Sequence, residues 1–298
     1  MKKTILKFFL FILGLAFMSF MGFKMFSYEE KLPTASSENS KIIYNKLSNR
    51  LISYNINDQK IEQDFNFLNF MQYSFNTQDN YYTSGHSYNN NFEILKINNN
   101  KIEKVYKPDN SANVAIFPFA SDSINRIYLF VNYDSNGTEL ERNLIQFKEN
   151  NLIHYKNIAG IITNGVICND NLYFTIYNKS TDTFSLSTIP INSYNANPEL
   201  LAEGLENGEL FNYNNDIYVS NENYIYNNTN TFEKKHINEF FDDYLIQMYV
   251  DENGDGILEI YSINEHKIIK KYPEAIGYEI YDNVMTIFCH NKLETFQF

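Results

Sequence analysis

Oxygen-bearing side chains gather in one ten-residue stretch of the chain, residues 251–260, which reads DENGDGILEI. Calcium loops in proteins supply side-chain oxygens from positions one, three, five and nine, a backbone carbonyl from position seven and a glycine at position six. This stretch has a glycine at position six and oxygen-bearing residues at the other places. It therefore predicts calcium as a cofactor, bound by Asp251, Asn253, Asp255, the carbonyl of Ile257 and Glu259.

The same stretch resembles the calcium-binding hairpin of the FG-GAP/VCBS propeller repeats, whose pattern is D-x-[DN]-x-D-G-x-x-D followed by apolar residues. Two features depart from that family, because Glu259 replaces the last Asp and the Gly-Ala-Pro and Phe-Gly signatures are missing. The resemblance covers about ten residues and implies one site. A plain polar hairpin is the alternative, since Asn253-Gly254 and the similar Asn136-Gly137 are two-residue turn dipeptides.

Histidines and other carboxylates select no catalytic site. His86 stands between serines in TSGHS, but the chain has no G-x-S-x-G elbow, and its other histidines lack the spacing of a zinc site. Pairs of acids such as Asp122 with Asp242 can be drawn freely, and no spacing favours one pair. The adjacent acids Asp242 and Asp243 in FFDDY interrupt an apolar run, so they either face an interior channel or lie at a sheet edge. We therefore predict no catalytic residue and leave enzymatic activity open.

Short strand-like runs fill the chain from Lys41 onward. Runs of four to eight residues rich in Ile, Tyr, Phe and Val alternate with clusters of Asn, Asp, Ser and Gly, which is typical of many short strands. One strand type carries a tyrosine near its start, and these tyrosines are 38, 46, 45 and 45 residues apart: Tyr44, Tyr82, Tyr128, Tyr173 and Tyr218. Four short strands repeated every 40–50 residues or so predict the blades of a β-propeller.

Polarity changes in order within each repeat. Apolar runs such as NVAIFPFA (113–120) suit an innermost strand, and charged runs such as KIEKVY (101–106) and KIIKKY (267–272) suit an outermost strand. We expect an all-β propeller of six or seven four-stranded blades in residues 41–298. We also expect the last run, KLETFQF (292–298), to be a strand through which the last blade pairs with the first and closes the ring. Paired β-sandwiches or a β-solenoid are the competing architectures.

The N-terminal end carries a candidate membrane segment. Lys2, Lys3 and Lys7 precede an apolar run, residues 8–23, that Lys24 closes. The run is intermediate between a signal-peptide core of about 7–15 residues and a spanning helix of about 20. We expect residues 1–30 to form an uncleaved signal anchor, with a cleaved signal as the alternative, followed by a flexible linker at residues 31–40. The positive flank keeps this end in the cytoplasm and places residues 41–298 outside.

Charge and cysteine content exclude some functions for the exported part. Residues 32–298 hold 19 Lys and Arg and 34 Asp and Glu, a net charge of −15. Such a surface repels nucleic acid and attracts cations and basic partners, so we exclude nucleic-acid binding. Cys168 and Cys289 are the only cysteines, and both lie in apolar runs, which favours buried free thiols over a disulfide.

These features together predict a membrane-anchored, extracytoplasmic β-propeller that acts as a binding domain for a protein or a cell-wall polymer. Polar loops after the tyrosine strands would open on one face, where a partner binds. The alternative is a propeller-type hydrolase or lyase acting on an extracytoplasmic glycan or peptide. An enzyme would place two or three carboxylates, or a Ser/His/Asp set, on innermost strands of different blades, whereas a binding domain would have an apolar or merely wet channel.

Overall fold

The structure is a computed structural model that describes residues 34–35, 37–65, 70–75, 80–86, 92–98, 101–109, 113–148, 151–155 and 158–298. Contacts group Thr34–Phe298 into one compact unit. The expected anchor at residues 1–30 lies outside the described residues, so it stays a prediction. Among the described residues, no helix has the length and apolar character needed to cross a membrane.

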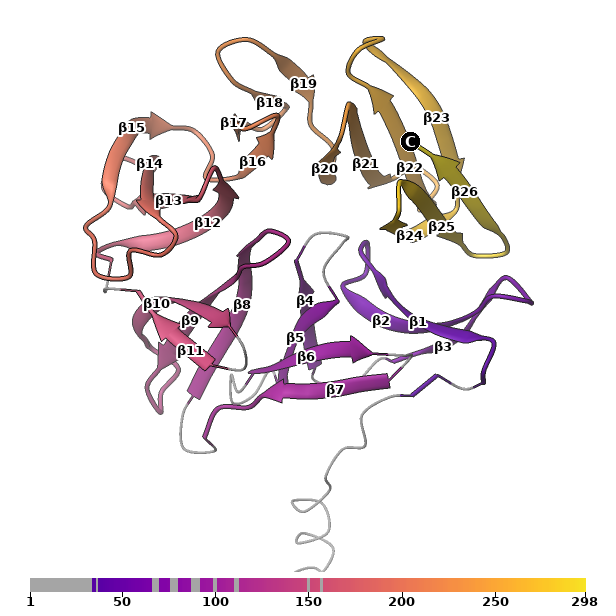
Figure 1. Cartoon of the computed structure of the whole chain (residues 1–298), viewed down its shortest axis with the longest axis horizontal. Helices are drawn as coiled ribbons and strands as arrows, with labels where there is room; N and C mark the ends of the chain where they lie inside the picture. Colours follow the sequence, from indigo (N-terminus) through magenta and orange to yellow (C-terminus); the bar gives the residue numbers. More distant parts are fainter. Residues whose placement is uncertain are drawn as a thin grey trace, which may run out of the picture. The chain divides into compact units, whose positions relative to one another are not determined.

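Seven antiparallel sheets follow one another along the chain, from indigo to yellow in Figure 1. The fold is an all-β propeller, and its blade count is seven rather than six. Blades 2 to 6 have four strands each, in agreement with the prediction. In the part of the chain that the structure describes, blades 1 and 7 have three strands each, β1-β2-β3 and β24-β25-β26, and neither sheet takes a strand from the other.

Strand positions follow the same order in every blade. The innermost strands are β1 (Ser40–Asn45), β4 (Phe70–Ser74), β8 (Asn113–Ser121), β12 (Ile161–Cys168), β16 (Leu210–Tyr213), β20 (Ile237–Phe241) and β24 (Ala275–Tyr281). The second strands are β2 (Arg50–Asn55), β5 (Tyr81–His86), β9 (Arg126–Tyr133), β13 (Asn171–Asn178), β17 (Asp216–Ser220), β21 (Tyr244–Val250) and β25 (Val284–Cys289).

The third strands are β3 (Lys60–Asp64), β6 (Phe92–Asn98), β10 (Glu139–Lys148), β14 (Thr183–Pro190), β18 (Tyr224–Tyr226), β22 (Gly256–Ser262) and β26 (Leu293–Gln297). The fourth strands are β7 (Lys101–Tyr106), β11 (Asn151–His154), β15 (Glu199–Leu205), β19 (Thr231–Glu233) and β23 (Lys267–Pro273). The charged runs predicted as outermost strands are β7 and β23, so the predicted polarity gradient is confirmed. Four repeat tyrosines lie on second strands, but Tyr44 lies on the innermost strand β1.

Two-residue turns join several innermost strands to their second strands. Asn169-Asp170, Asn214-Asn215 and Asp282-Asn283 all have positive φ angles, between 47° and 62°. Two successive residues with positive φ make the turn whose twist matches that of the flanking strands, and Asn and Asp tolerate this conformation better than other residues with side chains. These short polar pairs therefore set the register of blades 4, 5 and 7.

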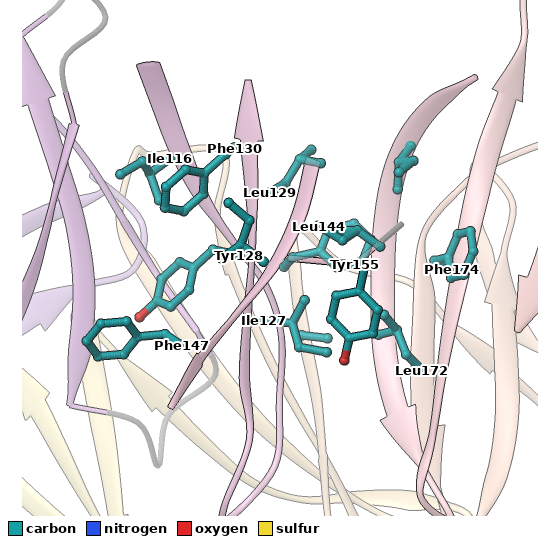
Figure 2. Packing of buried hydrophobic residues seen from close by; sticks show 14 of the residues in the cluster. Ile116, Ile127, Tyr128, Leu129, Phe130, Leu144, Phe147, Tyr155, Leu172 and Phe174 are labelled. Carbon is teal, nitrogen blue, oxygen red and sulfur yellow. The ribbon is translucent and has the colours of Figure 1, made fainter. Parts of the chain in front are cut away.

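Aromatic and aliphatic side chains fill the space between blades 2, 3 and 4. Ile116, Tyr128 and Phe174 are fully buried there, and Figure 2 shows them with their neighbours. The buried Tyr155 donates its hydroxyl to the Ile191 carbonyl at 2.6 Å, which ties the end of blade 3 to blade 4. Each large apolar side chain buried in this way contributes about 1.5–3 kcal/mol to folding.

Blades 1 and 7 meet through side chains, which corrects the expectation that a shared strand closes the ring. The Tyr54 hydroxyl donates to the carbonyl oxygens of Cys289 and Lys292, 2.9 Å from each. Its ring packs edge-on against Phe288 at 5.2 Å. A Cβ atom at Gly277 would lie 2.8 Å from a backbone oxygen of β1, so only glycine allows this close approach. The predicted terminal strand exists as β26, but it pairs with β25 in its own blade.

Candidate functional site

The innermost strands surround a central cavity of about 480 Å³. Its walls come from β1, β4, β8, β12, β16 and β20, or from the turns that follow β1 and β4. Pockets that bind small molecules have volumes of about 300–1,000 Å³. The cavity is therefore large enough for a small ligand or a short segment of a polymer.

Three side chains from three different blades meet beside this cavity, two of them in its wall and Tyr278 behind Glu239, and we call Lys46, Glu239 and Tyr278 the central set. The Lys46 ammonium donates to Oε2 of Glu239 at 3.1 Å, and the Tyr278 hydroxyl donates to the same oxygen at 2.7 Å. The Lys46 Nζ also lies 4.4 Å from the centre of the Tyr278 ring, within cation–π range. Lys46 and Glu239 line the cavity wall.

Local structure holds each member of the central set in place. Lys46 follows β1 directly, and the Asn45 side chain accepts hydrogen bonds from two backbone N–H groups of the same turn, both at 3.1 Å. This Asx turn fixes the backbone next to Lys46. Glu239 stands in the middle of β20 and Tyr278 in the middle of β24. The set thus joins blades 1, 6 and 7.

Burial governs the ionisation of the central set. The side chains of Lys46 and Glu239 are 11% and 10% exposed. Burial lowers the pKa of Lys46, and the neighbouring Glu239 carboxylate offsets part of that effect. Burial, with Glu239 close by, raises the pKa of Tyr278 well above its ordinary value. Tyr278 is therefore a neutral donor at physiological pH, while the charges of Lys46 and Glu239 cancel.

Two asparagines on neighbouring blades add amide groups to the cavity wall. The Asn164 side-chain oxygen accepts from the Leu210 N–H at 3.0 Å, and the Asn212 side-chain nitrogen donates to the Ile167 carbonyl at 2.9 Å. Asn164 keeps its side-chain nitrogen as a donor, and Asn212 keeps its side-chain oxygen as an acceptor. Aromatic side chains also line the cavity, among them those of Phe119, Phe211 and Phe240.

The stretch singled out in the sequence begins with the turn between β21 and β22. The Asp251 carboxylate accepts from the backbone N–H groups of Asn253 and Asp255, both at 2.9 Å, and Gly254 has a φ of 90°. These backbone bonds, first that of Asp255, lower the pKa of Asp251. The loop at residues 134–138 has the same arrangement, with both bonds at 2.8 Å. Turn formation therefore accounts for the residues that the two loops share.

Glu259, the last of the predicted calcium ligands, is bonded to two other side chains. Glu259 lies in β22, where its side chain is 5% exposed, and it accepts from the Lys271 ammonium at 2.9 Å and the Tyr249 hydroxyl at 2.8 Å. We call these three residues the peripheral set. In the part of the chain that the structure describes, no group of three or more His, Cys, Asp and Glu residues is placed to hold a metal ion. Calcium at Asp251, Asn253, Asp255, Ile257 and Glu259 therefore stays a prediction.

Other residues considered in the sequence lie away from the cavity. Asp242 and Asp243 are exposed in the turn after β20, and Asp243 accepts from the Asn264 side chain at 2.9 Å, so FFDDY does not send its acids towards a channel. The His86 side chain lies outside the described residues, whereas the other four histidines are exposed. The cysteines are buried free thiols, as predicted. Burial raises the pKa of Cys289 to about 11.

The sequence did not identify the central set. Lys46 and Glu239 are 193 residues apart, so no local motif joins them. One signal was available, because Glu239 is an acid within the strand sequence INEFF, which is otherwise mostly apolar. An acid on the inner strand of a blade needs a partner, and the partner had to come from another blade.

Comparisons with known proteins give a likeness of fold. No protein-family model and no curated protein sequence matches the chain. A structure of puromycin hydrolase has 7% identity and a TM-score of 0.49, with 90% of this chain and 52% of that chain covered. A puromycin-hydrolyzing peptidase of Mycobacterium tuberculosis has 8% identity and a TM-score of 0.47, with 89% and 55% covered. The chain thus spans about half the length of these peptidases.

A further similar structure is a Bacteroides fragilis protein described as exported. It has 9% identity and a TM-score of 0.42, with 87% of this chain and 86% of that chain covered. At these identities the likeness concerns the propeller fold alone, and no activity follows from it.

Proposed function

We propose that this protein is an extracytoplasmic binding domain, held at the membrane by its N-terminal segment, that takes a protein or cell-wall ligand at its central cavity. The positive flank and apolar run at residues 2–24 support export and anchoring. The negative charge of the exported part supports a partner other than nucleic acid. The cavity supplies the place where the ligand makes contact.

One observation carries the preference for binding over hydrolysis. Among the described residues that line the cavity, Glu239 is the single carboxylate, and it is already paired with Lys46. Glycoside hydrolysis ordinarily needs two carboxyl groups on either side of the bond that breaks. The remaining walls are aliphatic, aromatic, amide and hydroxyl groups, which suit recognition of a ligand without chemistry on it.

Photo-crosslinking in intact cells tests this function. Phe211 lines the cavity, and replacement by p-benzoylphenylalanine keeps an aromatic ring there. Tyr281, which is 79% exposed, is the matched control at the surface. We expect a crosslinked adduct from position 211 and little from position 281. Adducts from position 281 alone, or from neither position, would contradict a ligand in the cavity.

A further inference from the structure

The central set gives the cavity a particular charge. Lys46 and Glu239 are the two charged residues among the described cavity-lining residues, and they form an ion pair. A charged ligand would lose its hydration on entry and find no net opposite charge to replace it. A neutral polar ligand avoids that loss.

Lys46 still has hydrogen-bonding capacity in this ion pair. An ammonium group has three donors, and Glu239 takes one of them. The Tyr278 ring lies 4.4 Å from Nζ and attracts the positive charge through its face, which is a cation–π contact and not a hydrogen bond to an oxygen acceptor. Lys46 therefore keeps donors for an oxygen atom of a ligand, and a hydrogen bond from a charged donor is stronger than one between neutral groups.

The asparagines of blades 4 and 5 complement both polar groups of an amide. Asn212 keeps an acceptor oxygen for a ligand N–H, and Asn164 keeps a donor for a ligand oxygen. Phe119 and Phe211 also line the cavity, and their aromatic rings suit the apolar faces of a planar group. An amide is neutral and planar, and it carries one donor and one strong acceptor.

We propose that the cavity binds a neutral ligand through an amide group, with Lys46 donating to the amide oxygen. This inference rests on the proposed function, because it names the chemistry of the ligand in the same cavity. The same amide chemistry occurs in acetamido sugars and in peptides, so the experiment has one probe for each source.

The experiment measures binding of small probes to the full chain by calorimetry. The neutral probes are N,N′-diacetylchitobiose and N-acetyl-dialanine amide, and the charged probes are deacetylated chitobiose and N-acetyl-dialanine with a free carboxylate. We expect one neutral probe to bind at least about tenfold more tightly than its charged counterpart. Lys46→Met should weaken that probe by about tenfold, since a hydrogen bond from a charged group is lost. Lys271→Met, which removes a lysine of the peripheral set, should leave binding unchanged.

A variant that changes the net charge of the cavity gives the more specific test. Glu239→Gln leaves the Lys46 ammonium without its counter-ion, so the preference should shift towards the anionic peptide probe. The double variant Lys46→Met, Glu239→Met removes both charges, so it can be measured if the Glu239→Gln variant does not fold. Its affinity for the neutral probe should fall by about the same factor as that of Lys46→Met. Equal binding of neutral and charged probes, or unchanged binding by the double variant, overturns the proposal. Crosslinking at position 211 without binding of either neutral probe refutes this ligand class and leaves the proposed function standing.

Discussion

The molecule contains two sets of the same three residue types, a lysine, a glutamate and a tyrosine, in different surroundings. The central set draws one residue from each of three blades and lies at the cavity. The peripheral set lies within blade 6, with one residue on each of β21, β22 and β23. In both sets one glutamate oxygen accepts from the lysine and from the tyrosine hydroxyl.

Exposure of the lysine separates the two sets. The Lys46 side chain is 11% exposed and that of Lys271 is 53% exposed. Burial lowers the pKa of Lys46, whereas hydrogen bonds to Tyr249 and Glu259 raise the pKa of Lys271. The same partners thus move the lysine pKa in opposite directions, because loss of hydration exceeds the pairing energy only where water is excluded.

Removal of the glutamate should separate the two sets most strongly. Glu239→Ala leaves a buried ammonium without a counter-ion, and we expect a loss of about 3–5 kcal/mol in the free energy of unfolding. Glu259→Ala should cost about 1 kcal/mol, since Lys271 can turn into water. Urea unfolding of each variant measures both values. Equal losses of unfolding free energy in the two variants would contradict a larger contribution from the buried pair.

The pH dependence of stability should differ in sign between the two lysines. The pKa of Lys46 lies below its unfolded value of 10.5, so the unfolded chain binds more protons as pH approaches 10.5 from below, and stability from this residue rises with pH. The pKa of Lys271 lies above 10.5, so its contribution is complete below that pH and is lost as pH rises through the raised value. Stability of Lys46→Met and Lys271→Met relative to wild type, measured from pH 8 to 11 or so, tests this. Slopes of the same sign would contradict it.

The smallest effect concerns the turn beside the peripheral set. Asp251→Ala and Asp134→Ala each remove an acceptor of two backbone N–H groups, and we expect each to lower the melting temperature slightly and by a similar amount, with or without calcium. Millimolar calcium at an extracellular-type site would add about 0.4–1.4 kcal/mol. A calcium-dependent rise in melting temperature that Asp255→Ala abolishes and Asp134→Ala spares would instead support the calcium prediction. Calcium would then draw Glu259 away from Lys271.

Much of the fold could be predicted because local patterns determine it. The apolar run at 113–120 and the charged run at 267–272 revealed which strand is innermost and which outermost, since burial within a blade depends on strand position. Blade count was harder to predict, because β18 and β19 have only three residues each and, among the described strands, blades 1 and 7 have three rather than four. Short strands leave too few residues for an alternating pattern.

The candidate site could hardly be predicted, because the ring rather than the chain brings it together. Lys46 is one residue beyond a strand, and nothing near it in sequence marks it as buried. The stretch 251–260 predicted a site because its oxygen-bearing residues are close in sequence. In the structure, Asp251 stabilises a turn, whereas Glu259 lies within a strand. Spacing along the chain predicts sites within one loop, whereas residues from three blades meet only after the sheets have packed.

The seam between blades 1 and 7 has a consequence for movement. Each of these blades is a separate hydrogen-bonded sheet, and among the described residues no strand pairing crosses between them. Parting the seam breaks the Tyr54 hydroxyl bonds, the Lys41–Glu279 ion pair and side-chain packing, but it leaves the backbone ladders of both sheets whole. Opening of the ring is therefore a separate reaction from unfolding of a blade. The ion pair between Lys41 on β1 and Glu279 on β24 crosses this seam, so together with the Tyr54 hydroxyl it sets how readily the ring opens.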